Sequence, residues 1–286
     1  MTRDKANHFK AKHKPKAPPP ATGSFFLSHS HPIKSPRPGL PQGELQGFPK
    51  NALILYGFHA VREALRNKAR RHLALYVTQP AAERLETEIA AVGLVPQIVT
   101  TQELSRRLGP NAVHQGVALA TRGLPSADLS NLESGQKLVV VLDQLTDPHN
   151  VGAILRLAAA FGVDAVITTE RHAPEFSGTM AKAASGGVEH VAVIRVVNLA
   201  RALADLGDWG YLRLGLDSAA ATDLAAIELR RPLALVLGGE GKGLRRLSRE
   251  NCDMVVRLDM PGPIRSLNVS NACAVALTLL QRGLPA

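Results

Sequence analysis

The C-terminal half of the chain alternates short apolar runs with helical patterns, and this alternation limits the possible folds more than any other feature. Its first run, Lys137–Asp143 (KLVVVLD), is continuously apolar and β-branched, which is typical of a strand buried on both faces. Further strand-type runs follow at Val163–Thr168, Val191–Val196, Tyr211–Leu216, Leu233–Leu237 and Asp253–Leu258. Helical patterns lie between most of them, and the clearest are Val151–Phe161 and Val269–Leu280. The alternation predicts an α/β fold with a mostly parallel sheet covered by helices on both faces.

A smaller α/β unit is expected before this sheet. Its predicted helices are Gly57–Leu65, Ala81–Val92 and Thr101–Leu108, and its predicted strands are Leu73–Val77, Val95–Val99 and Val117–Ala120. A stretch rich in Ser, Gly, Pro and Asn then follows at 121–136. We therefore expect a tail at 1–50, a small domain at 51–122, a linker at 123–136 and a larger domain at 137–286.

Residues 1–50 differ in composition from the rest of the chain. They hold nine prolines, nine Lys and Arg, and two acidic residues, so this tail carries +7 of the total charge of +10. Such a density of proline disfavours helices and paired strands, and we expect disorder. A basic tail suits a polyanionic partner, but it suits a solvated, solubilising role equally well.

Composition also excludes several classes of protein. No run of 18 or more apolar residues is present, and the N-terminus lacks the apolar region of a secretory signal. The two cysteines, Cys252 and Cys273, have no metal-ligand spacing, and two isolated thiols fit a reducing compartment. We expect a cytoplasmic protein without a membrane anchor or a metal.

The familiar nucleotide-binding motifs are missing. A dinucleotide site needs Gly-x-Gly-x-x-Gly directly after the first strand, whereas Asp143 is followed by QLTDPHN. The glycine-rich stretch Gly238–Gly243 ends without the Gly-Lys-Ser/Thr of a phosphate-binding loop, and Leu244 stands where the hydroxyl would be needed.

Three polar clusters instead follow the ends of predicted strands, where open α/β sheets bind ligands. They are Asp147–Arg156, the glycine loop with Glu240, and Met260–Asn271. Taken singly, Asn150, Ser266 and Asn268 fit helix caps, and Arg156 and Glu240 fit solvated charges. Their joint occurrence along one sheet favours a site.

The sequences DPHNVGAILRLAAAFG, LVLGGEGKGL and MPGPIRSLNVSNACAVAL resemble the three motifs of the SpoU/TrmH branch of the SPOUT methyltransferases. The resemblance covers about residues 137–284, and it includes the stretch Lys182–Leu203 between the first two motifs. Residues 53–122, with YGFHAVREAL and HQGVALA, resemble the L30e-like RNA-binding domain that often precedes this domain. The combination resembles the bacterial 23S rRNA guanosine-2′-O-methyltransferase subgroup.

The resemblance implies a SPOUT α/β-knot, in which a trefoil-knotted, mostly parallel sheet binds S-adenosylmethionine, and it implies a homodimer that completes the site across its interface. The implied catalytic residues are Asn150, Arg156, Glu240, Ser266 and Asn268. The implied cofactor-binding residues are Thr168, Gly238, Glu240, Leu258, Met260, Ser266 and Leu267. This sequence departs from the family pattern at Leu157, Asn271 and Cys273.

The implied activity is transfer of a methyl group from S-adenosylmethionine to a ribose 2′-hydroxyl in RNA, with a guanosine of 23S rRNA as the expected target. In that reading Arg156 positions the RNA, Glu240 holds the loop and Arg156, and Ser266 and Asn268 form hydrogen bonds around the ribose and the cofactor. Two alternatives remain, the same chemistry on tRNA and a non-catalytic RNA-binding protein. A purely structural α/β module is the last-ranked alternative. A basic group in the small domain fits phosphate contacts or a solvated helix face equally well, and it comprises Arg62, Arg66, Lys68, Arg70 and Arg71.

Overall fold

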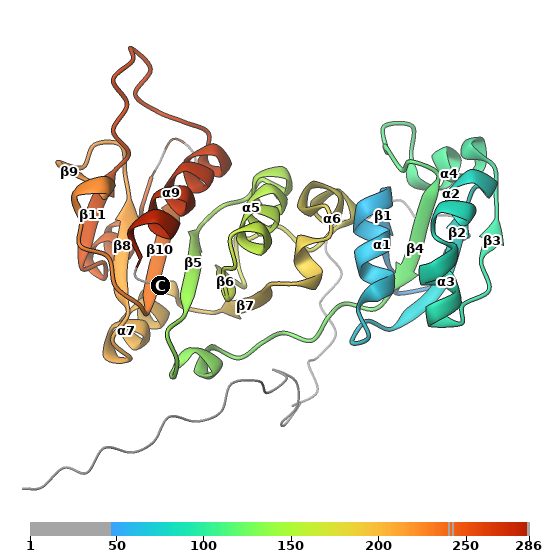
Figure 1. Ribbon diagram of the computed structural model, residues 1–286, viewed down its shortest axis with the longest axis horizontal. Helices are drawn as coiled ribbons and strands as arrows, with labels where there is room; N and C mark the ends of the chain where they lie inside the picture. The colour runs from blue at the N-terminus through green and yellow to red at the C-terminus, as the bar shows by residue number, and fades with distance from the viewer. Residues whose placement is uncertain (1–46, 240, 242, 285–286) are drawn as a thin grey trace, which may run out of the picture. The chain divides into compact units, whose positions relative to one another are not determined.

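The computed structural model describes residues 47–239, 241 and 243–284 (Figure 1). The predictions for residues 1–46 of the tail and for Glu240 lie outside the described residues.

A four-stranded sheet forms the small domain, in the order β1-β4-β2-β3. Its strands are β1 (Leu53–Tyr56), β2 (His72–Val77), β3 (Gln97–Ile98) and β4 (Val117–Thr121), and its helices are α1 (Phe58–Arg66), α2 (Gln79–Arg84), α3 (Glu86–Val92) and α4 (Thr101–Leu108). β4 pairs antiparallel with β1 and β2, and β2 pairs parallel with β3. The single helix predicted at Ala81–Val92 is wrong, because Leu85 leaves helical geometry (φ −109°, ψ 9°) and is fully buried in the small core.

A seven-stranded sheet forms the larger domain, in the order β7-β6-β5-β10-β8-β11-β9. The strands are β5 (Leu138–Asp143), β6 (Ala165–Thr169), β7 (Ala192–Val196), β8 (Leu212–Leu216), β9 (Thr222–Asp223), β10 (Leu233–Gly238) and β11 (Met254–Arg257). The helices are α5 (Pro148–Ala160), α6 (Gly178–Ala184), α7 (Leu199–Asp208), α8 (Arg246–Glu250) and α9 (Val269–Gly283), with 3-10 turns η1 (Leu129–Leu132), η2 (Gly187–Glu189) and η3 (Leu224–Ala226). Every strand pair of this sheet is parallel, which confirms the predicted α/β class.

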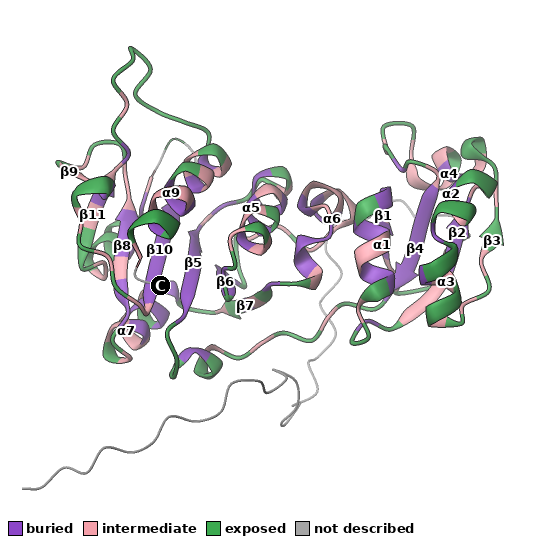
Figure 2. Cartoon of the chain, viewed as in Figure 1, coloured by how far each residue is buried: buried purple, intermediate pink, exposed green. Residues whose placement is uncertain are grey.

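Apolar side chains cover both faces of the larger sheet. Alternate residues of β5 enter different clusters, with Val140 packing among α5, α6 and α9, and Val141 packing toward α7. All six residues of β5 are buried, as the purple central strands of Figure 2 show. A strand buried on both faces must be apolar throughout, which is why its sequence runs without alternation.

The connecting segment between the two sheets packs against the larger one. Leu132 of η1 is buried in the cluster that includes α7, and its carbonyl accepts a hydrogen bond from the Tyr211 hydroxyl at 3.0 Å. Ala127 also forms a parallel bridge with Ile194 of the edge strand β7. Burial raises the pKa of Tyr211 to about 12, so this hydroxyl remains a donor at neutral pH. In the part of the chain that the structure describes, no helix has the length and hydropathy to cross a membrane.

Candidate active site

Adjacent strands β5 and β10 end beside one another, with Asp143 opposite Gly238. The loops that follow these strands enclose a cavity of about 340 Å³. Its lining residues are Asp143, Gln144, Leu145, Thr146, Asp147, Asn150, His172, Gly239, Gly243, Arg245 and Val269. The cavity therefore occupies the position where parallel α/β sheets bind ligands.

A buried carboxylate connects the two loops. The side chain of Asp143 is fully buried, and its two oxygens accept hydrogen bonds from the backbone N–H of Arg245 at 2.9 Å and from Arg245 Nε at 2.5 Å. A buried charge is tolerated only when it is paired and hydrogen-bonded, and both conditions hold here. Asp143 thus fixes the segment after the glycine loop against the end of β5.

The glycine loop turns tightly because its glycines allow it. A Cβ at Gly238 would lie 2.2 Å from the backbone carbon of Gly243, a distance that no side chain tolerates. Gly243 has φ +63°, and its N–H donates to the carbonyl of Gly239 at 2.9 Å. The loop closes on itself beside the cavity, and Glu240 within it lies outside the described residues.

Helix α5 begins at the cavity. Asp147, rather than Asn150, is its N-cap, and the Asp147 carboxylate accepts hydrogen bonds from the N–H groups of His149 and Asn150. Pro148 occupies the first helical position, which suits its fixed φ. The expectation that Asn150 caps this helix is therefore wrong. Its side chain is buried inside the first turn and lines the cavity, where an amide can both donate and accept hydrogen bonds.

Arg156 lies on a different side of the same helix. It follows Asn150 by six residues, which places it about 240° around the helix axis. The residue is exposed and is not among those that line the cavity. Within one chain, the structure therefore separates Arg156 from Asn150.

The third predicted cluster forms an exposed loop that leads into α9. All residues from Pro261 to Asn268 are exposed, Ser266 included. Asn268 caps α9, because its Oδ1 accepts hydrogen bonds from the Ser270 N–H at 2.9 Å and the Ser270 hydroxyl at 2.6 Å. Val269, the next residue, reaches the cavity, whereas Ser266 and Asn268 do not line it.

Three of the expected cofactor-binding residues lie at or just after the ends of strands. Thr168 is buried near the end of β6, Gly238 ends β10, and Leu258 is buried just after β11. Met260 is half-buried and Leu267 is 43% exposed. Among the described residues, no backbone-to-backbone hydrogen bond outside helices and strands involves 259–267. The Met260 carbonyl accepts a hydrogen bond from Arg265 Nη1 at 2.8 Å. The apolar side chains of Leu258 and Met260 suit an adenosine-containing cofactor.

Two of the three residues that depart from the family pattern, Leu157 and Cys273, are accommodated by packing. Leu157 is partly buried against the core of the larger domain, and Cys273 is fully buried in the same cluster. Burial raises the pKa of the Cys273 thiol to about 12. Asn271 lies exposed on α9, and nothing in the structure assigns it a role.

Sequence reasoning missed Asp143, Gln144, His172 and Arg245, all of which line the cavity. Asp143 did leave a signal, because it is a charged residue that ends an otherwise apolar strand. His172 has φ +65°, a left-handed backbone conformation that could not be predicted from the sequence. Across the described residues, no cluster of His, Cys, Asp and Glu could hold a metal ion.

Comparison with solved structures identifies the fold. The SpoU methyltransferase AviRb from Streptomyces viridochromogenes, in complex with AdoMet, matches with a TM-score of 0.69 at 21% identity, over 81% of this chain and 89% of that one. An AdoMet-bound rRNA methyltransferase from Sinorhizobium meliloti matches with a TM-score of 0.69 at 22% identity, over 82% and 88%. The fold is that of the SpoU methyltransferases, which confirms the expected SPOUT fold.

Sequence relatives and family models then give the family. The model of the SpoU rRNA Methylase family matches residues 137–278, and that of the RNA 2′-O ribose methyltransferase substrate-binding domain matches residues 54–127. The chain is 41% identical to the 23S rRNA (guanosine-2′-O-)-methyltransferase RlmB of Xylella fastidiosa over 239 residues, 80% of this chain and 95% of that protein. It is 38% identical to the RlmB of Yersinia pestis over 82% of this chain and 99% of that protein. The chain belongs to the SpoU rRNA methylase family.

Proposed function

We propose that this protein transfers a methyl group from S-adenosylmethionine to the ribose 2′-hydroxyl of a guanosine in 23S rRNA. The observation that carries the proposal is the match to RlmB proteins along both domains, together with the cavity that Asn150 lines at the ends of β5 and β10. The tRNA alternative and the non-catalytic alternative have no comparable support.

S-adenosylmethionine supplies an activated methyl group when bound, and the residues proposed to hold it are Thr168, Gly238, Glu240, Leu258, Met260, Ser266 and Leu267. Apolar contacts from Leu258 and Met260, and backbone groups of the 259–267 loop, suit its adenosine part. The protein's task is then to exclude water and to orient the ribose hydroxyl toward the methyl group. Asn150 has the donor and the acceptor needed to hold that hydroxyl.

The exposed position of Arg156 supports a homodimeric enzyme. Because Arg156 is exposed and does not line the cavity of its own chain, we propose that it acts at the cavity of a second copy. A guanidinium stays protonated at neutral pH and offers a planar fork of donors, so it positions an RNA phosphate or ribose. Glu240, Ser266 and Asn268 complete the proposed catalytic set.

The remaining assignments are proposed with this function. The domain boundaries are 51–122 for RNA binding, 123–136 for the linker and 137–286 for methyl transfer. The protein acts in the cytoplasm, where its rRNA substrate is assembled.

The deciding experiment is a site-resolved map of 2′-O-methylation in total RNA from cells with and without this protein. We expect the loss of one guanosine mark in 23S rRNA, and its return when the gene is supplied in trans. Loss of a tRNA mark would move the substrate to tRNA. If the methylation map is unchanged and the purified protein does not bind S-adenosylmethionine, the result would favour the alternative of a non-catalytic RNA-binding protein.

A further inference from the structure

The segment α6–η2 contributes side chains to two hydrophobic cores. Met180, Ala184 and Val188 are buried in the core of the larger domain. Ala181, between them in the sequence, is buried among residues of the small domain such as Leu55 and Phe58. The same short segment therefore contributes to the cores of both domains.

Glycines allow the small domain to approach this segment closely. A Cβ at Gly178 would lie 2.5 Å from the Tyr56 ring and 2.6 Å from the carbonyl oxygen of Ile54. A Cβ at Gly186 would lie 2.5 Å from Cγ of Glu63. Side chains larger than hydrogen at these two positions would force the contact apart.

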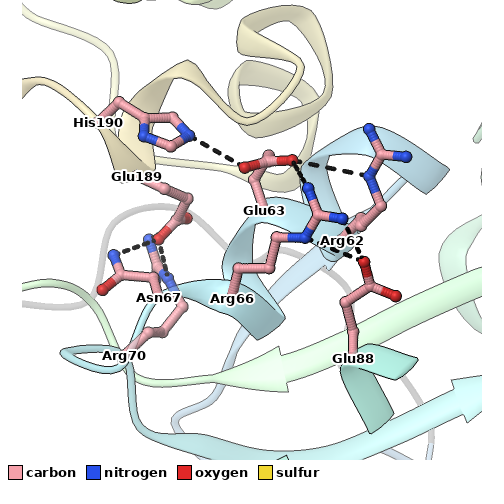
Figure 3. A network of polar contacts seen from close by, with 8 residues as sticks. All are labelled: Arg62, Glu63, Arg66, Asn67, Arg70, Glu88, Glu189 and His190. Atoms are coloured by element: carbon pink, nitrogen blue, oxygen red, sulfur yellow. Dashed lines mark hydrogen bonds and ion pairs between the residues drawn. The ribbon is translucent and has the colours of Figure 1, made fainter. Parts of the chain in front are cut away.

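A buried ion pair lies at the end of this contact (Figure 3). Arg70 of the small domain donates from Nε to Glu189 Oε2 at 2.9 Å and from Nη2 to Glu189 Oε1 at 2.7 Å. Both side chains are only 1% exposed. The remaining donor, Arg70 Nη1, bonds the carbonyl of Arg122 at 3.0 Å, and Asn67 Nδ2 bonds Glu189 Oε2 at 2.8 Å.

The ion pairs show which residues of the basic group in the small domain can contact RNA phosphates. Arg70 is fully engaged and buried, so it does not face an RNA phosphate. Arg66 pairs with Glu63 and Glu88, and Arg62 lies 3.6 Å from Glu63. Lys68 and Arg71 are exposed and remain available for phosphate contacts.

Burying two charges is costly unless both partners stay in place, because removal of one leaves the other as an unpaired buried charge. A fork-to-fork pair also tolerates little change in angle. The Arg70–Glu189 pair therefore favours one orientation of the small domain over others, beyond the affinity that apolar packing provides.

The contact reaches the helix that carries Arg156. Glu189 ends η2, and η2 begins at Gly187, whose Cβ would lie 2.6 Å from the Leu155 carbonyl oxygen and 2.9 Å from Arg156 Cα. The backbone that anchors the small domain is therefore packed directly on the backbone of α5 at Arg156.

We propose that Glu189 is a positioning residue, which acts through Arg70 to hold the small domain in the orientation that delivers RNA to the methyl-transfer site. The proposal rests on the proposed function. RNA held by Lys68 and Arg71 reaches the site only when the small domain is docked. The apparent affinity for RNA therefore falls in proportion to the fraction of molecules in which the domain is docked.

The test compares Glu189→Gln with a matched control, Glu88→Gln, in the full chain. Glu88 is also a buried carboxylate paired with an arginine, but its partner Arg66 belongs to the same domain. If Glu189→Gln leaves the small domain docked for about a tenth of the time, the KM for 23S rRNA rises roughly tenfold, with a smaller change in kcat and unchanged S-adenosylmethionine affinity. Glu88→Gln should leave the KM within about twofold of wild type.

The direction of the change in RNA affinity of Glu189→Gln distinguishes a positioning role from a simple effect of net charge. Loss of a negative charge would by itself strengthen binding to RNA, whereas the proposal predicts weaker binding. Arg70→Gln should reproduce the KM of Glu189→Gln, and the double variant should be no worse than either single variant, since both remove one interaction.

Hydrogen exchange gives a readout that does not depend on activity. Glu189→Gln should speed exchange at the amides of α1 and α6 relative to Glu88→Gln, even if 23S rRNA proves not to be the substrate. Unchanged exchange would overturn the docking role. Faster exchange with an unchanged KM, in an enzyme that methylates rRNA, would show that docking does not serve RNA delivery.

Discussion

Asp143 is the residue on which the candidate site depends most for its shape. Its buried carboxylate receives two hydrogen bonds from Arg245, one of them from a charged group. We expect Asp143→Ala to lower the free energy of unfolding by about 2–3 kcal/mol, because hydrogen bonds to charged, buried groups contribute at that level. Urea titration measures the loss. The exposed pair Arg246–Glu250 is the control, since Glu250→Ala should change stability by less than about 1 kcal/mol.

Arg156 carries a different kind of prediction, because it is exposed and its loss leaves no cavity. Arg156→Ala should reduce methyl transfer to RNA by about a hundredfold, the scale at which misplacing a substrate slows a reaction. Stability and S-adenosylmethionine affinity should stay at wild-type values. Single-turnover assays measure the change, and Arg201→Ala, an exposed arginine on α7, is the comparison. Full activity in Arg156→Ala would remove the arginine from the proposed catalytic set.

The two thiols should be chemically silent in the native protein. Burial raises the pKa of both Cys252 and Cys273 to about 12, so neither forms much thiolate at about pH 8. Incubation with iodoacetamide, followed by mass spectrometry, should show no labelled cysteine in the native protein and two in concentrated guanidinium chloride. Native labelling of Cys273 would show that α9 opens readily.

Individual residues were predicted unevenly from the sequence. Asn150 was expected at the site and does line the cavity, because a motif that follows a buried strand is placed by the strand. Ser266 and Asn268 are predicted to act there too, and these roles stay predictions. Within one chain Ser266 lies in an exposed loop and Asn268 caps α9. A motif specifies which residues are near in sequence, whereas the path of an irregular loop depends on contacts that sequence spacing does not contain.

At the scale of elements, strands β8 and β11 are tied together by a charge pair. Asp253, just before β11, accepts hydrogen bonds from the backbone N–H of Arg213 at 2.8 Å and from its guanidinium at 2.7 and 3.1 Å. The hydrogen bond from the Arg213 side chain is the main reason that the pKa of Asp253 lies below its ordinary value of 3.8.

A lowered carboxylate pKa stabilises the fold above the unfolded pKa, and this contribution is lost as the pH falls through the folded value. Asp253→Asn should therefore reduce the free energy of unfolding at pH 7 by about 0.5–1 kcal/mol, the range for a partly exposed pair. The difference from wild type should shrink as the pH falls below 3.8. Urea titrations of both proteins from pH 7 to pH 3 would test it, and a difference as large at pH 3 as at pH 7 would contradict the assigned cause.

Secondary structure was largely predictable, and its failures have physical causes. Continuous apolar runs marked β5 and β10, because strands buried on both faces need no alternation. Helix α5 begins at Pro148, before the predicted start at Val151, because proline fits the first turn of a helix. The break between α2 and α3 at Leu85 is not marked by a Gly or Pro in the sequence. It depends on the packing of Leu85 in the core of the small domain.

At the scale of the whole molecule, the sequence predicted two α/β units but not how they meet. Arg70 and Glu189 are 119 residues apart. For Arg70 the sequence fits a phosphate contact or a solvated helix face, and it gives no indication for Glu189. Strand order within the larger sheet was equally hidden, because β8 lies between β10 and β11 only in space. Long-range pairings of this kind depend on the complementary shapes of distant segments.

The segment α6–η2 has a consequence for cooperativity. Because Ala181 completes the small domain's core while its neighbours fill the core of the larger domain, neither core can be lost without exposing part of the other. Calorimetry of the intact chain should therefore show one unfolding transition, with equal calorimetric and van't Hoff enthalpies, in place of two. Two resolved transitions would mean that the domains fold independently. A single transition would mean that the enzyme loses RNA capture and methyl transfer at the same temperature.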